Sequence, residues 1–172
     1  AADVVVVEFE SAEIGDHVES WQEKGVTFAL AHQPTKSKAK GRVMFFPHIA
    51  SGHKGILNAM ADESIPVSVT FPSIVNMVEL KLWGSTTRAA VVEAFDAEGK
   101  LVDQASLDHV PVRKRPEEPV PIFQMKVQGE GIASIQISGS QPGGFLAADE
   151  LRFHPQPTAS ELTSSDDSEA AP

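Results

Sequence analysis

Hydrophobic and polar residues alternate along much of the first 154 positions of the chain. The alternation covers Gly25 to Leu30, Ile65 to Phe71 and Val78 to Leu82. A period of two is typical of a strand that buries one face and exposes the other. The β-branched run within Val4 to Glu10 predicts a further strand at the start.

The second half of the chain continues this pattern. Residues 90–94 alternate up to a predicted hairpin turn at 96–100, where Gly99 can take the positive φ that such turns require. The partner strand is predicted at 101–107, and further strands are predicted at 122–127, 132–137 and 151–153. About eight to ten strands at roughly ten-residue spacing favour an all-β, antiparallel β-sandwich over a fold with crossover helices.

One segment has helical rather than strand spacing. Ile14, Val18 and Trp21 fall on one side of a helix, and Asp16 is a suitable cap for its amino end. A single short helix is therefore a candidate at residues 14–24.

The composition changes at Pro155. Residues 155–172 contain no Lys or Arg, four acidic residues and almost no large apolar side chain. Such a segment cannot bury enough surface to offset its chain entropy. We therefore predict a single β-sandwich domain at residues 1–154 and a disordered acidic tail or linker at 155–172.

Charge and residue types exclude several classes of function. The chain has 24 acidic and 14 basic residues and a formal net charge of −10. A negative chain of this kind repels a phosphate backbone, so nucleic acid is not an expected partner. The absence of cysteine excludes thiol catalysis, thiolate metal sites and disulfides.

The predicted location is extracytoplasmic. The longest apolar run, Val4 to Val7, is far shorter than the about 20 residues that cross a bilayer, so membrane insertion is not expected. The chain begins at Ala1, which fits a secreted, periplasmic or cell-surface protein that has lost a signal peptide and fits a trimmed chain as well.

Four motifs occur in an order that resembles a known family. They are EFESAEIGDHVESWQEKGVTF, then GILNAM followed by IPVSVTFPSIVNMVELKL, then EAFDAEGKLV, and finally IASIQISGSQPGGFLAADELRF. Together they resemble secreted bacterial β-sandwich domains of the galactose-binding-like, jelly-roll type, over most of residues 4–154. The resemblance implies a non-catalytic carbohydrate-binding or adhesion domain, often with a structural calcium ion where the first and last strands meet.

Four carboxylates flank the terminal strands. Glu8 and Glu10 share one side of the first strand, and Asp149 and Glu150 precede the last strand. If the terminal strands lie side by side, as the resemblance implies, these oxygens converge into a site that suits calcium. The alternative is that all four are ordinary solvated residues. A glycosidase pair is disfavoured, because two acids on one strand do not face each other across a cleft.

Two aromatic residues are candidate sugar contacts. Trp83 shares a strand face with Glu79 and Lys81, and Phe95 shares one with Glu93. An exposed ring beside polar groups is a suitable stacking platform for a sugar. The alternative is that both rings are covered by a loop or by the other sheet.

The stretch FFPHIASGHKGILNAM contains four further candidates for ligand binding, His48, His53, Lys54 and Asn58. No zinc-protease spacing, nucleophile elbow or phosphate loop accompanies the two histidines. We therefore predict a loop between two strands whose polar residues hydrogen-bond a saccharide, and the alternative is a plain loop at the rim of the sandwich.

The favoured prediction is a non-catalytic binding module whose partner is a carbohydrate or cell-surface glycan, with calcium as a structural ion. Two alternatives remain from the sequence. One is a structural or adhesion domain that binds another protein, and the other is a glycan hydrolase.

Overall fold

The computed structural model of the protein describes residues 4–9, 17–18, 20–32, 43–47, 54–58, 65–84, 89–111, 114–118, 121–139 and 146–157. For residues 17–18, 43–47, 54–58, 146–147 and 149 it describes the backbone alone. The strands in these segments are β1 (Val5–Val7), β2 (His17–Val18), β3 (Ser20–Glu23), β4 (Val26–Leu30), β5 (Val43–Pro47), β6 (Lys54–Asn58), β7 (Val67–Gly84), β8 (Ala90–Phe95), β9 (Leu101–Leu107), β10 (Phe123–Gly139) and β11 (Leu146–Pro155).

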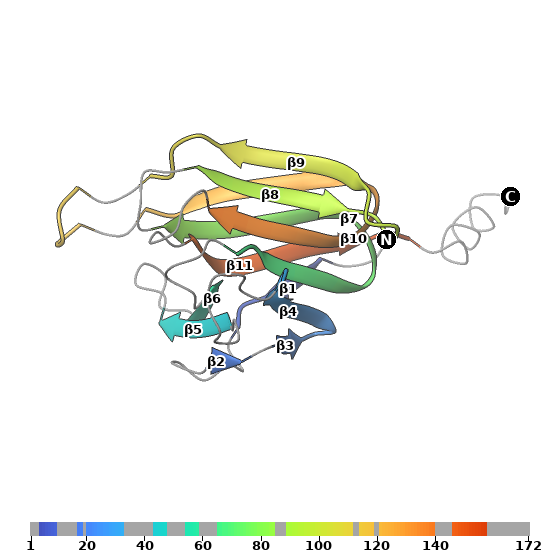
Figure 1. Ribbon diagram of the computed structural model, residues 1–172, viewed down its shortest axis with the longest axis horizontal. Coiled ribbons are helices and arrows are strands. Elements are labelled where there is room, and N and C mark those ends of the chain that lie inside the picture. The colour runs from blue at the N-terminus through green and yellow to red at the C-terminus, as the bar shows by residue number, and fades with distance from the viewer. Residues whose placement is uncertain are drawn as a thin grey trace, which may run out of the picture.

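The strands pair antiparallel in one continuous sheet, and the bends of β7 and β10 divide it into two parts, called here the first and the second sheet. The first sheet has the order β3-β4-β7-β10-β8-β9, and β7 contributes residues 67–70 to it. The second sheet has the order β2-β5-β6-β11-β7-β10, and β7 contributes residues 75–84 to it. β1 pairs with β11 as well. In Figure 1, β8 and β9 lie along the upper edge and β2 and β5 along the lower edge. The predicted all-β antiparallel sandwich is confirmed.

Both shared strands bend where they leave one sheet and enter the other. In β10 the extra residues bulge out between Gln128 and Ile132, and Gly131 there has a positive φ of 81°. In β7 the pairing with β10 is interrupted between Thr70 and Val75, a stretch that contains Pro72. Bulges increase the local twist and change the direction of a strand.

These bends correct two predictions. The segments 65–71 and 78–82 were expected to be separate strands, as were 122–127 and 132–137, but each pair belongs to one long strand. The alternation of buried side chains loses its phase at a bulge. In a sequence, such a loss of phase resembles a turn.

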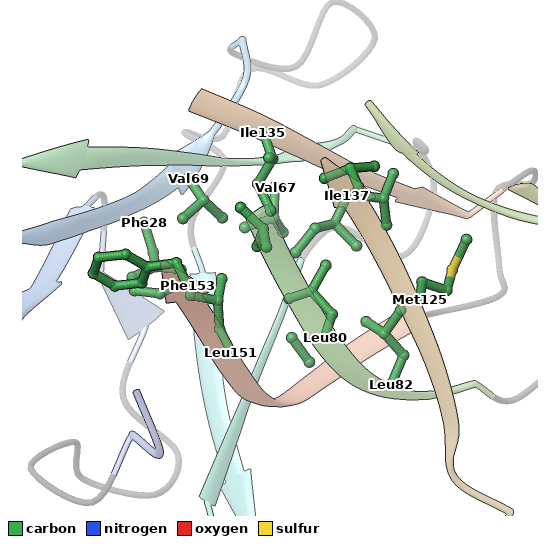
Figure 2. Packing of buried hydrophobic residues seen from close by; sticks show 14 of the residues in the cluster. Phe28, Val67, Val69, Leu80, Leu82, Met125, Ile135, Ile137, Leu151 and Phe153 are labelled. Carbon is green, nitrogen blue, oxygen red and sulfur yellow. The ribbon is translucent and has the colours of Figure 1, made fainter. Parts of the chain in front are cut away.

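Side chains from both sheets fill the space between them, as Figure 2 shows. The first sheet contributes Phe28, Val67, Val69, Ile135 and Ile137, and the second contributes Leu80, Leu82, Leu151 and Phe153. At one end of this core, the rings of Phe9, Trp21 and Phe28 lie with centroids 5.1 to 5.7 Å apart. Tilted and edge-on contacts at such distances are the favourable arrangement of aromatic rings.

The predicted helix at 14–24 is wrong for the residues of that segment that the structure describes. His17–Val18 and Ser20–Glu23 are strands, and Trp21 pairs with Phe28 across a hairpin. Lys24 and Gly25 connect β3 and β4 with φ values of 52° and 80°. Two central residues with positive φ are the mark of a two-residue hairpin turn, and this turn returns the chain along β3. In no described segment does a helix form that is long and apolar enough to cross a membrane.

The predicted hairpin of residues 90–107 is confirmed. β8 pairs with β9, and Gly99 in the connecting turn has a φ of 83°. Asp96 Oδ1 accepts hydrogen bonds from the N–H groups of Glu98 and Lys100, at 3.0 and 2.8 Å. These bonds hold the turn in one conformation.

The last strand extends past the predicted domain boundary. The N–H of Gln156 donates to the carbonyl of Ile74 at 2.9 Å, and its side-chain Oε1 accepts from the N–H of Gly131 at 3.0 Å. The fold therefore includes Gln156. Residues 158–172 lie outside the described residues, so the disordered tail stays a prediction.

Candidate functional site

The outer surface of the first sheet carries two rows of mainly uncharged polar residues. One row runs across neighbouring strands through Thr27, Thr70, Ser134, Phe95 and Leu101. The next row contains Ala29, Ser68, Gln136, Glu93 and Gln104. We call these two rows the hydroxyl face. Their positions alternate with buried residues of the core, so their side chains point away from it.

The polar groups of the hydroxyl face are accessible. Thr70 and Gln104 are exposed, and Ser68, Ser134 and Gln136 are half-buried between their neighbours. Within the described segments, the one side-chain hydrogen bond on this face joins Gln22 Nε2 to Thr27 Oγ1 at 3.3 Å. The remaining hydroxyl and amide groups are available to bind water or a ligand.

Phe95 provides an aromatic ring on this face. Its side chain is half-buried, and it lies beside Ser134 of β10 and Leu101 of β9, which is 49% exposed. Glu93, two residues earlier on β8, shares the same face. The sequence prediction that Phe95 and Glu93 share a face therefore agrees with the structure, and Phe95 remains a candidate for contact with a sugar.

The outer surface of the second sheet has a different character. Its rows contain Glu79, Lys81, Gln124, Lys126, Glu150 and Arg152, which we call the ion-pair face. Lys81 Nζ lies 3.2 Å from Glu150 Oε2, and Arg152 Nε donates to the same oxygen at 3.1 Å. Gln124 Nε2 donates to Glu79 Oε2 at 3.3 Å. Glu150 is therefore paired with one cation on the neighbouring strand β7 and with another on its own strand.

These ion pairs set the charge state of Glu150. Its partial burial works to raise the pKa of the carboxyl, but hydrogen bonds and charges from Arg152 and Lys81 outweigh the burial, so the pKa lies below the ordinary value. Glu150 raises the pKa of the Arg152 guanidinium in turn, with smaller contributions from the charges of Glu79 and Glu8. The Glu150 carboxylate is ionised and already has two cationic partners.

The structure tests only the strand arrangement on which the calcium prediction depends. β1 pairs with β11, so the terminal strands lie side by side as expected. Both oxygens of Glu150, however, are occupied by Arg152, with the second at 3.4 Å from Nη2. Glu10 and the side chain of Asp149 lie outside the described residues. Among the residues that are described, no group of three or more metal-ligating side chains occurs. In this arrangement Glu150 does not fit a calcium ligand, and the ion itself stays a prediction.

Trp83 is not the exposed platform that the alternation predicted. Its side chain is only 6% exposed. It stands at the end of β7, opposite Ala147, where Leu82, Trp83 and Gly84 are all buried. Alternation indicates which face of a strand a side chain takes, but not what lies over that face. The alternative interpretation, a covered ring, is correct for Trp83.

The loop candidates are placed only through their strands. Lys54 and Asn58 are the first and last residues of β6, which pairs with β5 and β11, and their side chains lie outside the description. His48 and His53 fall between β5 and β6, outside the described residues. Lys54, which was predicted in the loop, belongs to β6 instead, and the role of this segment in ligand binding stays a prediction.

Sequence reasoning did not identify most of the hydroxyl face. The alternation marked Ser68, Thr70, Ser134 and Gln136 as outward positions of their strands, but not as neighbours. They become neighbours through the register of β7 against β10, in which Thr70 faces Ser134 and Ser68 faces Gln136. No local signal carries this register, because it depends on strands more than 60 residues apart in the sequence.

Comparison with known proteins supports the fold. No family model matches this sequence, and no curated protein matches it. Among solved structures, the K1 cleaved adhesin domain of Lys-gingipain from Porphyromonas gingivalis W83 is similar, with a TM-score of 0.52 and 10% sequence identity. The match covers 90% of this chain and 99% of that domain. At this identity, the likeness shows a shared fold alone.

Two carbohydrate-binding modules are similar to a lesser degree. A point mutant of CBM29-2, a family 29 carbohydrate-binding module, has a TM-score of 0.49 and 11% identity, over 88% of this chain and 91% of that chain. TmCBM61, in complex with β-1,4-galactotriose, has a TM-score of 0.47 and 13% identity, over 86% and 94%. The likeness that carries the conclusion on the fold is that to the adhesin domain, and it agrees with the β-sandwich that the sequence predicted.

Proposed function

We propose that the chain is a non-catalytic carbohydrate-binding module that contacts its glycan through the hydroxyl face. The supporting observation is the composition of that face, where hydroxyl and amide groups lie in the same two rows as the half-buried ring of Phe95. Sugars offer an apolar C–H surface for stacking and hydroxyl groups for hydrogen bonds, and this arrangement complements both. An extracytoplasmic location, where such glycans occur, is part of the proposal.

The ionisation of Glu150 argues against this residue as the general acid of a glycan hydrolase. A glycosidase needs a general acid whose pKa is raised, so that it holds a proton near neutral pH. Glu150 has a lowered pKa and two cationic partners. It is therefore unsuited to donate a proton to a leaving group.

The proposal is tested by retention on a panel of immobilised neutral polysaccharides, such as β-glucan, galactan, arabinan, xylan and mannan. We expect the full chain to bind at least one of them. Phe95→Ala removes the stacking surface and is expected to weaken that binding by about tenfold or more. Ile122→Ala is the control, because Ile122 is an apolar residue, 39% exposed, that does not belong to the hydroxyl face.

If Phe95→Ala and Ile122→Ala bind the glycan equally well, the hydroxyl face is not the contact surface. No binding to any polysaccharide of the panel, or to its carboxymethylated derivative, would favour the alternative of an adhesion domain with a protein partner. In that outcome the proposal fails as a whole.

A structural calcium ion near β1 and β11 is a separate part of the proposal, with Glu8, Glu10 and Asp149 as the remaining candidate ligands. An ion that binds only the folded state must raise the melting temperature by mass action. The measurement is the melting temperature in millimolar calcium and in excess chelator. Equal values would remove calcium from the proposal.

A further inference from the structure

The hydroxyl face contains a single ionisable side chain, that of Glu93. Its other members are hydroxyl, amide and apolar residues, and none of them is a cation. The turn between β8 and β9, residues 96–100, also has a negative net charge, because it contains Asp96, Glu98 and Lys100. Among the ten residues of the hydroxyl face, all of them described, a ligand therefore meets one carboxylate and no cation.

Glu93 lies at the centre of the polar part of the face. It faces Gln136 of β10 on one side and Gln104 of β9 on the other, so two amides flank its carboxylate. Phe95 follows two residues later on the same side of β8, which corresponds to about 6.8 Å along the strand. A sugar ring stacked on Phe95 lies close enough for its edge hydroxyl groups to reach Glu93.

The chemistry of a carboxylate decides which ligands suit this position. An ionised carboxylate only accepts hydrogen bonds, and bonds to a charged acceptor are stronger than those between neutral groups. Neutral sugars supply hydroxyl donors for it. Uronic acids and sulfated sugars bring a second negative charge to a partly desolvated surface, where like charges repel. The overall charge of −10 adds to this repulsion at longer range.

We infer that the hydroxyl face selects uncharged oligosaccharides over anionic ones, and that Glu93 sets this selection by accepting hydrogen bonds from sugar hydroxyl groups. The inference rests on the proposed function and adds the ligand class to it. Its structural basis is the position of one carboxylate between two amides and beside an aromatic ring, on a face without a cation.

The experiment measures affinity in solution for matched neutral and anionic ligands. The neutral ligand is the polysaccharide from the panel that the protein retains, and the anionic ligand is the carboxymethylated derivative of the same polysaccharide. The full chain is expected to bind the neutral ligand at least about tenfold more tightly, and a high salt concentration is expected to narrow this difference.

Glu93→Gln is the informative variant, because it keeps the size of the side chain and removes its charge. We expect it to weaken binding of the neutral ligand by about tenfold, because a charge-assisted hydrogen bond is lost, and to reduce the discrimination against the anionic ligand. Glu79→Gln is the matched control, since Glu79 is a half-buried glutamate on the ion-pair face. It is expected to change neither affinity. Circular dichroism and the melting temperature verify that both variants are folded.

Two results would overturn the inference while the proposed function stands. One is equal or tighter binding of the anionic ligand by the unmodified chain. The other is that Glu93→Gln and Glu79→Gln have equal affinities for each of the two ligands. Absence of glycan binding in the unmodified chain is a different result, and it contradicts the proposed function itself.

Discussion

The hydroxyl face and the ion-pair face share two strands, yet their polar groups are in opposite states of hydrogen bonding. β7 and β10 each supply residues to both faces, on either side of their bends. On the ion-pair face, two long side chains satisfy the charge of Glu150: Lys81 reaches it from the neighbouring strand, and Arg152 reaches it along the same strand. On the hydroxyl face, most side chains of these strands are short.

Side-chain length explains the difference. Residues that face each other on neighbouring strands have Cβ atoms about 4.5 to 5.5 Å apart. Lysine and arginine bridge such gaps easily, whereas the hydroxyl groups of Ser68 and Thr70 end close to the backbone. These hydroxyl groups are left to bind water or a ligand, whereas Lys81 and Arg152 of the ion-pair face are already bound to Glu150. Polarity alone therefore does not identify a binding surface, and the availability of its hydrogen-bonding groups does.

The largest expected effect concerns the core beneath the faces. Phe28 is fully buried, and its ring lies 5.1 Å from that of Phe9. Phe28→Ala is expected to lower the free energy of unfolding by about 3 to 5 kcal/mol, because it leaves a cavity in a close-packed interior. The measurement is urea unfolding followed by fluorescence and by circular dichroism.

Both probes should report one transition, because β7 and β10 belong to both sheets. Two separate transitions would mean that the sheets unfold independently. The two faces would then not share a common scaffold.

The next effect concerns the bend of β7 that separates the two faces. Gly25 has a φ of 80°, and a Cβ added there would lie 2.9 Å from Cβ of Pro72 in the bend. Gly25→Ala is expected to cost about 1 to 2 kcal/mol, from the strained φ and from the contact. Gly99→Ala is the control, because Gly99 has a φ of 83° but no atom within 4 Å of the added Cβ.

The difference between the two glycine variants isolates the contact with Pro72. Free energies of unfolding from urea titrations provide the comparison. If Gly99→Ala is as costly as Gly25→Ala, the turn of β3 and β4 does not support the bend of β7.

Alternation was sufficient to predict the class of fold, because it requires only that each strand bury one side. It also placed Glu93 and Phe95 on one strand face, since both lie on β8. It failed where the outcome depends on distant segments. A shift of one residue in the pairing of β7 with β10 would turn Ser134 toward the core, and nothing local to Ser134 fixes that pairing.

Local patterns also allowed two interpretations at residues 14–24. The spacing of Val18 and Trp21 fits a helix, but the pair Lys24 and Gly25 forms a two-residue turn that offers β4 as a partner strand. Tertiary pairing then outweighs the local spacing. Trp83 shows the same limit for exposure, since only the folded chain determines what covers its ring.

A smaller effect compares the two faces directly, through two glutamines of the same strand. Gln136 lies on the hydroxyl face and Gln124 on the ion-pair face, and both belong to β10. Gln136→Ala is expected to weaken glycan binding about fivefold to tenfold, which corresponds to one lost hydrogen bond. Gln124→Ala is expected to leave the affinity unchanged. Isothermal titration with the glycan identified from the panel measures the affinity of both variants. A larger loss of affinity in Gln124→Ala than in Gln136→Ala would mean that the binding site lies on the ion-pair face.

The smallest expected effect concerns the ion-pair face itself. Because the pKa of Glu150 is below its ordinary value of 4.5, its ionised form favours the folded state. This stabilisation is present above the ordinary value and is lost as the pH falls through the lowered pKa. Glu150→Gln is expected to lower the free energy of unfolding by about 1 kcal/mol at neutral pH, since Lys81 and Arg152 are nearly half exposed and become hydrated again.

The difference between Glu150→Gln and the unmodified protein should therefore disappear in acid, where the carboxyl is protonated in both the folded and the unfolded state. Urea unfolding at neutral pH and well below the lowered pKa measures it. A difference that does not change with pH would assign the effect to packing rather than to charge. Glycan affinity at neutral pH should be the same for both proteins, because Glu150 and its partners Lys81 and Arg152 belong to the ion-pair face and not to the hydroxyl face.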